Sequence, residues 1–215
     1  MSLECVLFDF DGTLADTERY NIEYFSLAME CFGVTVTEED KDALIGNTDP
    51  GIIQRILSRS PLKVSMDEWR KVRQSVGNTY EHDERLKPAP GVPEMLSALK
   101  GKGLKLAVVS STATHLVTAA LKRLSLYDFF DLVLCGDEFP KRKPDPAPYL
   151  LAMERLGVKA EDCIVVEDSP SGIQSGKAAG AYVIAYKGGS YEQDTSKADF
   201  EIKDFSELLS KCQIR

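Results

Sequence analysis

The chain has 215 residues, of which 43% are hydrophobic and 28% are charged, and its formal net charge is -8. This size and composition are typical of one globular domain, or of a core domain that carries a smaller insertion. Nucleic acids and anionic membranes are bound through clustered Lys and Arg side chains, so the acidic balance argues against both as partners. No apolar stretch approaches membrane-spanning length, and we infer no obligate protein partner.

The five cysteines are scattered along the chain without a CxxC spacing. Four of them lie in apolar runs or on periodic apolar faces, which predicts reduced core thiols and not a disulfide framework. The N-terminus also lacks a basic segment followed by an apolar one, so we expect a cytoplasmic location. The residues are Cys5, Cys31, Cys135, Cys163 and Cys212.

The first predicted element is a buried strand at residues 5–8, which ends at two aspartates in the sequence VLFDFDGTLADT. In an extended strand Asp9 and Asp11 would point to the same side. Two neighbouring carboxylates are costly unless a cation lies between them or one of them takes a proton. A simple turn is the alternative explanation, because Asp-Gly is a common turn dipeptide.

The pattern of residues 17–86 predicts helices and no strand. One apolar stripe ends at Gly33, a second follows Asp49-Pro50, and a third helix opens with a capping box at Ser65 and continues to Tyr80. The segment LKPAPGVP, residues 86–93, is expected to return the chain to the sheet. The stripes are Phe25, Ala28, Met29 and Phe32; Ile52, Ile53, Ile56 and Leu57; and Trp69, Val72 and Val76.

Four more short apolar runs, at residues 104–109, 132–135, 163–166 and 182–185, predict strands that are buried on both faces. Helical patterns separate them, including one that begins at Asp145-Pro146 and ends at Gly157. The fold class is therefore α/β, a doubly wound parallel sheet with a helical domain inserted after the first strand. We expect residues 1–16 and 87–215 to form the α/β core domain and residues 17–86 the helical cap domain.

Polar side chains follow several of the predicted strands, where an open α/β sheet binds its ligands. Asp9 and Asp11 follow the first strand, Ser110 and its neighbours the second, and Glu167-Asp168 the fourth. A basic run with Lys143 lies past the third. Each signal has a structural alternative, because hydroxyl residues cap helices, acids favour helix starts and basic runs are usually solvated.

Four such signals at the same edge of a sheet favour phosphoryl transfer over coincidence. Three or four carboxylates can hold Mg²⁺, which prefers oxygen ligands and would cancel the repulsion between Asp9 and Asp11. A hydroxyl group and backbone N–H groups at a helix start can bind phosphate oxygens. A lysine adds positive charge beside the transferring group.

Four ordered stretches then resemble the motifs of the haloacid dehalogenase superfamily, specifically its phosphatases and β-phosphoglucomutases with a helical cap. They are DFDGTLADT (9–17), VVSST (108–112), KPDP (143–146) and VVEDSPSGI (165–173). The resemblance covers essentially the whole chain in order and spacing. It implies a Rossmann-like core, Mg²⁺ as cofactor and a small phosphorylated metabolite as substrate.

The resemblance also implies roles for individual residues. Asp9 would be the nucleophile that forms an aspartyl phosphate, and Asp11 would act as general acid and then as general base. The phosphate would be held by Ser110, Ser111 and Lys143. The metal would be bound by Asp9, Asp11 through its backbone carbonyl, and Asp168, with Glu167 binding the metal or its water.

These residues favour a Mg²⁺-dependent phosphatase that acts on a small phosphorylated metabolite such as a sugar phosphate. A hexose-phosphate mutase is the alternative, but the histidine and the arginine of the β-phosphoglucomutases correspond here to Asn21 and Asp49, and Thr13 is typical of phosphatases. A metabolite-binding protein without turnover is a third possibility, against which the four intact motifs argue. We also expect the loop at residues 44–52 to influence substrate choice.

Overall fold

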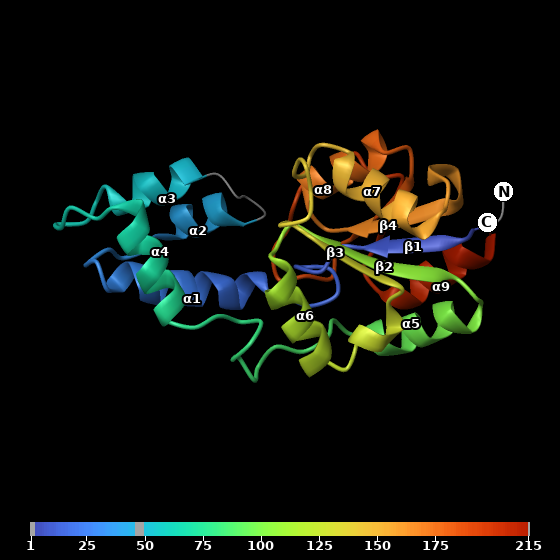
Figure 1. The fold of residues 1–215 in the computed structure, drawn as a ribbon, viewed down its shortest axis with the longest axis horizontal. Coiled ribbons are helices and arrows are strands. Elements are labelled where there is room, and N and C mark those ends of the chain that lie inside the picture. The colour runs from blue at the N-terminus through green and yellow to red at the C-terminus, as the bar shows by residue number, and fades with distance from the viewer. Residues whose placement is uncertain (1–2, 46–49, 215) are drawn as a thin grey trace. The chain divides into compact units, whose positions relative to one another are not determined.

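The computed structural model describes residues 3–45 and 50–214. The chain divides into two compact units: a core unit, Met1–Asp16 with Lys87–Arg215, and a helical unit, Thr17–Leu86 (Figure 1). In the part of the chain that the structure describes, no helix has the length and apolar character needed to span a bilayer.

The core unit contains one parallel sheet of six strands in the order β3-β2-β1-β4-β5-β6. The register pairs Phe8 of β1 with Val108 of β2 on one side and with Val166 of β4 on the other. The strand order therefore reverses at β1, which is where open α/β sheets bind ligands. The strands are β1 (Cys5–Phe8), β2 (Lys105–Ser110), β3 (Leu132–Cys135), β4 (Cys163–Glu167), β5 (Tyr182–Tyr186) and β6 (Phe200–Ile202).

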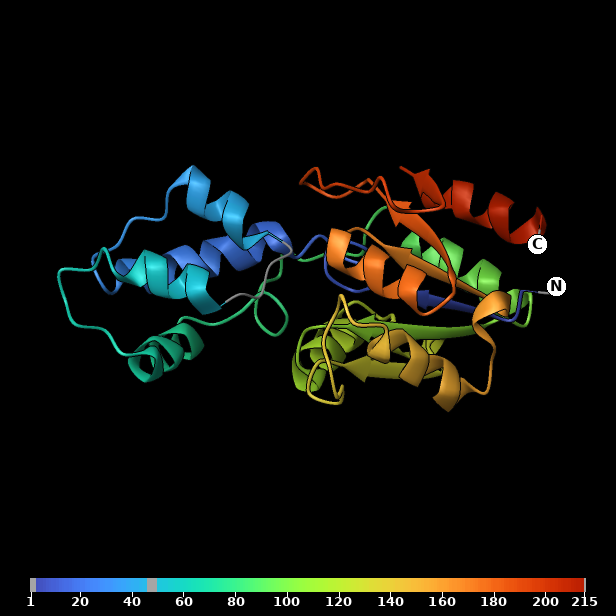
Figure 2. The same cartoon turned by 90° about the horizontal axis from the view of Figure 1, so that it is seen from above.

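Helices cover both faces of the sheet, as Figures 1 and 2 show, and this confirms the predicted doubly wound fold. One face carries α5 (Val92–Gly101), α6 (Thr114–Arg123) and α9 (Phe205–Ile214), and the other carries α7 (Ala147–Leu156) and α8 (Pro170–Ala178). Two short 3-10 turns, η1 (Tyr127–Phe129) and η2 (Ala160–Asp162), precede β3 and β4. Strand β6 was not predicted, because it has three residues and an exposed glutamate at its centre.

The core of the sheet is made of the apolar strand residues that the sequence singles out. One cluster joins alternate residues of β1, β2, β4 and β5 to side chains of α7 and α8, so those helices are held by apolar burial. The prediction for the start of α7 needs a small correction, since the helix begins at Ala147 and not at Pro146. The N-cap is Pro146 and not Asp145 as predicted; Asp145, one residue earlier, accepts the Ala147 N–H with its Oδ1 at 2.9 Å.

The helical unit consists of α1 (Glu18–Glu30), α2 (Glu38–Leu44), α3 (Pro50–Leu57) and α4 (Met66–Ser75). The predicted stripes of α1, α3 and α4 meet in one apolar cluster, where Trp69 packs edge-on against Phe25 with ring centroids 5.0 Å apart. The predicted capping box at Ser65 is present, because its hydroxyl accepts the Glu68 N–H at 3.2 Å.

Two predictions for the helical unit were wrong. Helix α2 was missed, because its sequence EEDKDAL has almost no apolar stripe; its capping box, in which Thr37 and Asp40 bond each other's backbone N–H, was the available signal. Helix α4 does not reach Tyr80 but ends at Ser75, and Gly77 follows at φ +85°. Asp49 lies outside the described residues.

Candidate active site

Asp9 directly follows β1 at the point where the strand order reverses. Its backbone N–H donates to the Val166 carbonyl at 2.9 Å, which continues the pairing of β1 with β4 by one residue. The chain then turns at Gly12, whose φ of +77° favours glycine. The Asp9 carboxylate is thereby fixed at the carboxyl edge of the sheet with a side-chain exposure of 10%.

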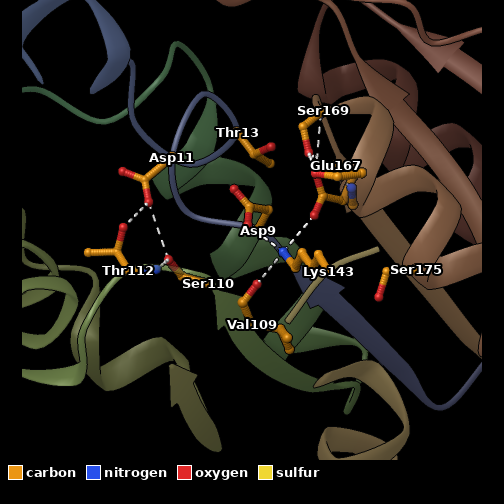
Figure 3. Close-up of polar contacts among 12 residues, drawn as sticks. Asp9, Asp11, Thr13, Val109, Ser110, Thr112, Lys143, Glu167, Ser169 and Ser175 are labelled. Carbon is orange, nitrogen blue, oxygen red and sulfur yellow. Dashed lines mark hydrogen bonds and ion pairs between the residues drawn. The ribbon is translucent and has the colours of Figure 1, made fainter. Parts of the chain in front are cut away.

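Lys143 joins three of the strand ends through one buried ammonium group (Figure 3). Its Nζ donates to Asp9 Oδ1 at 2.6 Å, to Glu167 Oε1 at 2.6 Å and to the Val109 carbonyl at 2.7 Å. The side chain is only 3% exposed. The basic run is therefore not simply a solvated face, because its last lysine lies inside the site.

The segment that carries Lys143 is fastened to α8. Ser175, which is fully buried on that helix, donates its hydroxyl to the Asp145 carbonyl at 2.6 Å. Asp145 follows Lys143 by two residues, so this bond fixes the backbone next to the lysine. The position of the ammonium group depends on α8 as well as on the sheet.

Glu167 is fully buried, and both of its carboxylate oxygens are occupied by protein donors. Oε1 accepts from Lys143 and from the Tyr149 hydroxyl at 2.8 Å, and Oε2 accepts from the Ser169 hydroxyl at 3.0 Å and the Ser169 N–H at 3.3 Å. A carboxylate offers about four acceptor positions, and here all four are used. Glu167 therefore holds the lysine directly, with no acceptor position left for a metal-bound water.

The charges of this buried group oppose one another. Burial alone lowers the pKa of Lys143, but the carboxylates of Asp9 and Glu167 outweigh it and hold that pKa well above its usual value. Burial raises the pKa of Asp9, and the carboxylates of Glu167 and Asp11 raise it further. Lys143 acts in the opposite direction and lowers it. The lysine is thus a permanent cation, and the acids around it outnumber it.

Asp11 contacts the end of β2. Its Oδ2 accepts the Thr112 hydroxyl at 2.9 Å and the Ser110 hydroxyl at 3.2 Å. These hydroxyls do not cap α6, which was the structural alternative, because the Thr114 N–H at the start of that helix donates to Asp137 Oδ1 at 2.9 Å. The three side chains orient one another at the sheet edge (Figure 3).

Asp168 completes the acidic group. Its Oδ1 accepts the Thr13 hydroxyl at 3.4 Å and its Oδ2 accepts the Gln193 amide at 3.0 Å. The carboxylate lies so close to Gly12 that a Cβ at that position would collide with Oδ2. Gly12 is therefore required both by its backbone conformation and by the approach of Asp168.

The donor set of the site fits Mg²⁺. One carboxylate oxygen from each of Asp9, Glu167 and Asp168 lies within 4.8 Å of the others. Three hard oxygen ligands with an excess of negative charge suit a small divalent cation that keeps part of its water shell. Because Glu167 has no acceptor position left, Asp9 and Asp168 are the direct ligands that the geometry favours.

Of the residues predicted from the sequence, the structure brings Asp9, Lys143, Glu167 and Asp168 together, and places Ser110 against Asp11. Ser111 follows β2, and among the described residues no hydrogen bond to its side chain is formed.

Two contributors were missed. Tyr149 could have been noticed, because a phenol lies six residues after the lysine on the helix that follows it. Gln193 lies in a loop with no periodic or motif signal, so sequence reasoning had no means of finding it.

The comparison with protein families gives the class of the protein. The family model described as haloacid dehalogenase-like hydrolase matches residues 6–186, well over half of the chain. The chain belongs to this family. The predicted superfamily and the prediction of a hydrolytic enzyme are confirmed.

Relatives of known name agree with the phosphatase class that the motifs imply. A phosphorylated carbohydrates phosphatase of Thermotoga maritima is 36% identical over 179 residues, which cover 83% of this chain and 82% of the relative. A phosphoglycolate phosphatase of Aquifex aeolicus is 30% identical over 208 residues, covering 96% and 95%. The crystal structure of a candidate β-phosphoglucomutase from Thermotoga maritima has 30% identity and a TM-score of 0.80, covering 97% and 99%.

Proposed function

We propose that the protein is a Mg²⁺-dependent phosphatase that hydrolyses a small phosphorylated metabolite through an aspartyl phosphate on Asp9. The observation that carries the proposal is the buried pair of Asp9 and Lys143, joined at 2.6 Å at the carboxyl edge of the sheet. Only Lys143 among the described residues donates to this carboxylate, and it does so at Oδ1. The second oxygen, Oδ2, is therefore the one that can attack phosphorus.

In the first step, Asp9 Oδ2 forms a bond to phosphorus and the bond from phosphorus to the substrate oxygen breaks. Asp11 donates its proton to the departing oxygen, so that a neutral alcohol leaves. The hydroxyls of Ser110 and Thr112, which bond Asp11 Oδ2, orient this carboxyl group. The transferred group would be held by Ser110, Ser111 and Lys143.

In the second step, water attacks the phosphorus of the aspartyl phosphate and the acyl oxygen of Asp9 leaves as a carboxylate. Asp11, now deprotonated, takes the proton of that water, which restores its acid form and releases inorganic phosphate. Mg²⁺ bound by Asp9 and Asp168, with the Asp11 carbonyl, would neutralise phosphate charge. Glu167 holds Lys143 in place beside the metal site.

We take the helical unit, residues 17–86, as the cap domain and the cytoplasm as the location. The cysteines whose side chains the structure describes are free thiols, as expected of a reducing compartment. They are Cys5, Cys31, Cys135 and Cys163. The substrate is a phosphorylated metabolite such as a sugar phosphate, in keeping with the relatives' names.

The mutase remains the second candidate, because one similar structure carries that name. The presence of Asn21 in the helical unit, where the mutases have a histidine, argues against it. Offering β-glucose 1-phosphate with a bisphosphate activator separates the two, since a mutase would give an isomerised product without free phosphate.

The proposal is tested by measuring phosphate release from sugar phosphates, nucleotides and an aryl phosphate, with Mg²⁺ and with a chelator. We expect chelator-sensitive release by the wild type and at least a ~1,000-fold loss in Asp9→Asn, since removal of a covalent nucleophile has effects of this order. Asp16→Asn is the matched control: Asp16 contacts Ser190 outside the acidic group and should retain activity. Full turnover by folded Asp9→Asn protein would exclude the mechanism.

A further inference from the structure

The loop between β5 and β6, residues 187–195, lies against the turn that follows β1. The Ser190 hydroxyl donates to the Asp16 carboxylate. A Cβ on Gly189 would lie 3.3 Å from the Gly12 carbonyl oxygen, so the two backbones approach closely there. Because both segments belong to the core unit, the loop is placed directly beside the acidic group.

Gln193 of this loop contacts the acidic group. Its Nε2 donates to Asp168 Oδ2 at 3.0 Å, and both residues are half-buried. An ionised carboxylate can only accept hydrogen bonds, so the NH₂ end of the amide is the end that must face Asp168. The contact therefore fixes the orientation of the amide as well as that of the carboxylate.

The two oxygens of the Asp168 carboxylate have different surroundings. Oδ2 lies against the backbone of Gly12: it would be 2.2 Å from a Cβ at that position, whereas Oδ1 would be 3.2 Å away. Oδ1 accepts the Thr13 hydroxyl at 3.4 Å, which is long for a hydrogen bond between two oxygens. Oδ2 is thus held between Gly12 and the Gln193 amide, and Oδ1 is the oxygen more readily given to a metal ion.

The space beside Asp168 makes this contact important. Asp168, Gln193, Lys187 and Lys203 are among the residues that line a pocket of about 160 Å³. A single water needs about 10–15 Å³ of such volume, so the pocket has room for several waters and for a rotated carboxylate. The two lysines of the lining would attract that carboxylate away from the metal. The hydrogen bond from Gln193 opposes this rotation.

We propose that Gln193 is a positioning residue for the metal site: its amide holds Asp168 Oδ2 so that Oδ1 faces the ion. The proposal rests on the Mg²⁺ site of the proposed function and adds a residue that lies beyond 186, where the family match ends. Substitution of a residue that hydrogen-bonds a metal ligand typically weakens metal binding about 10–100-fold. Loss of the amide should therefore weaken Mg²⁺ binding without abolishing it.

A purely structural role of the loop is the competing explanation, and four variants separate the two. Gln193→Met removes the donor but keeps the length of the side chain, and Gln193→Ala removes the donor by truncation. Gln174→Met is the matched control, because it makes the same exchange at an exposed position of α8. Ser190→Ala removes the bond of the loop to Asp16 and leaves the Gln193 amide in place.

Mg²⁺ binding without substrate gives the first readout. Each full chain is titrated with MgCl₂ alone in an isothermal titration calorimeter. The Kd for Mg²⁺ should rise about tenfold or more in both Gln193 variants and should stay within about twofold of the wild type in Gln174→Met. An unchanged Kd in the two Gln193 variants would overturn the proposal. An equal rise in Ser190→Ala would also overturn it, because the effect would then belong to the loop and not to the amide.

Phosphate release from an aryl phosphate gives the second readout. In Gln193→Met the Mg²⁺ concentration for half-maximal release should rise by the same factor as the Kd, while kcat at saturating Mg²⁺ stays close to that of the wild type, since the bound ion meets the same ligands. A lower kcat with an unchanged half-maximal concentration would overturn the proposal. If the wild type binds Mg²⁺ but hydrolyses no ester, the proposed function fails and the calorimetric result alone decides the role of Gln193.

Discussion

The chemistry proposed at Asp9 depends on how one buried lysine is shared between two acids. Lys143 neutralises one of the two negative charges of Asp9 and Glu167, and Asp168 adds a third acid within reach. The group therefore keeps a net negative charge in a poorly hydrated place. Such a group attracts a divalent cation. Substitution of the lysine would destabilise the fold strongly, because removing one partner of a buried pair leaves an uncompensated charge.

Tyr149 contacts both Lys143 and Glu167. Its ring lies 5.0 Å from the Lys143 ammonium and its hydroxyl donates to Glu167, so it contacts both charges. Removing the hydroxyl in Tyr149→Phe keeps the ring but frees one acceptor position of Glu167. We expect kcat to fall about tenfold with little change in KM, as for other groups that orient a metal site or its neighbours. The free energy of unfolding should fall by about 1–2 kcal/mol.

The measurement is steady-state kinetics together with urea unfolding of the same samples. Tyr127→Phe is the control, because Tyr127 is 39% exposed and lies outside the site. If Tyr149→Phe lowered stability but left kcat unchanged, Tyr149 would be a packing residue only.

At the scale of elements, glycines allow other parts of the site to approach the backbone closely. A Cβ on Gly172 of α8 would collide with the Glu167 carboxylate, and one on Gly136 after β3 would collide with the Ser111 carbonyl. Ser169, at the N-cap of α8, accepts the Gly172 N–H at 3.1 Å and donates to Glu167. The same turn thus starts a helix and holds an acid of the site.

The helical unit has an acid-sensitive element of its own at the start of α2. Burial would raise the pKa of Asp40, but hydrogen bonds from the Thr37 backbone and from Arg59 outweigh it and lower that pKa. An acid whose pKa is depressed by folding stabilises the fold above its unfolded pKa, here about 3.9. This stabilisation is lost as the pH falls through the folded pKa.

Asp40→Asn should therefore lower the free energy of unfolding by about 1–3 kcal/mol at pH 7, and the difference from wild type should shrink below about pH 4. Unfolding in urea is followed by the fluorescence of Trp69, the single tryptophan, which lies in this unit. Asp42→Asn on the same helix, at an exposed position, should change little. An equal loss at both positions, or a loss independent of pH, would contradict the assignment.

At the scale of the whole molecule, the sheet could be predicted closely and the helical unit less well. Buried parallel strands are continuous apolar runs, and the first five strands were found for that reason. Helix α2 and strand β6 are short and charged, so tertiary packing decides them more than local pattern does.

The candidate site was also largely predictable, because the chemistry needs acids and a lysine at strand ends and the order of the chain supplies them. The four hydrogen bonds that Glu167 accepts could not be predicted, because they depend on where Tyr149 and Ser169 lie after folding.

The most direct test of the account is to trap the phosphorylated enzyme. Wild-type protein with Mg²⁺ is mixed with its preferred phosphomonoester, quenched in acid on the millisecond timescale, digested and mapped by mass spectrometry. The account predicts a phosphoryl group on Asp9 that forms and decays fast enough to carry turnover. Turnover with no adduct on Asp9, together with inversion of configuration at phosphorus, would show that water attacks the substrate directly and would contradict the account.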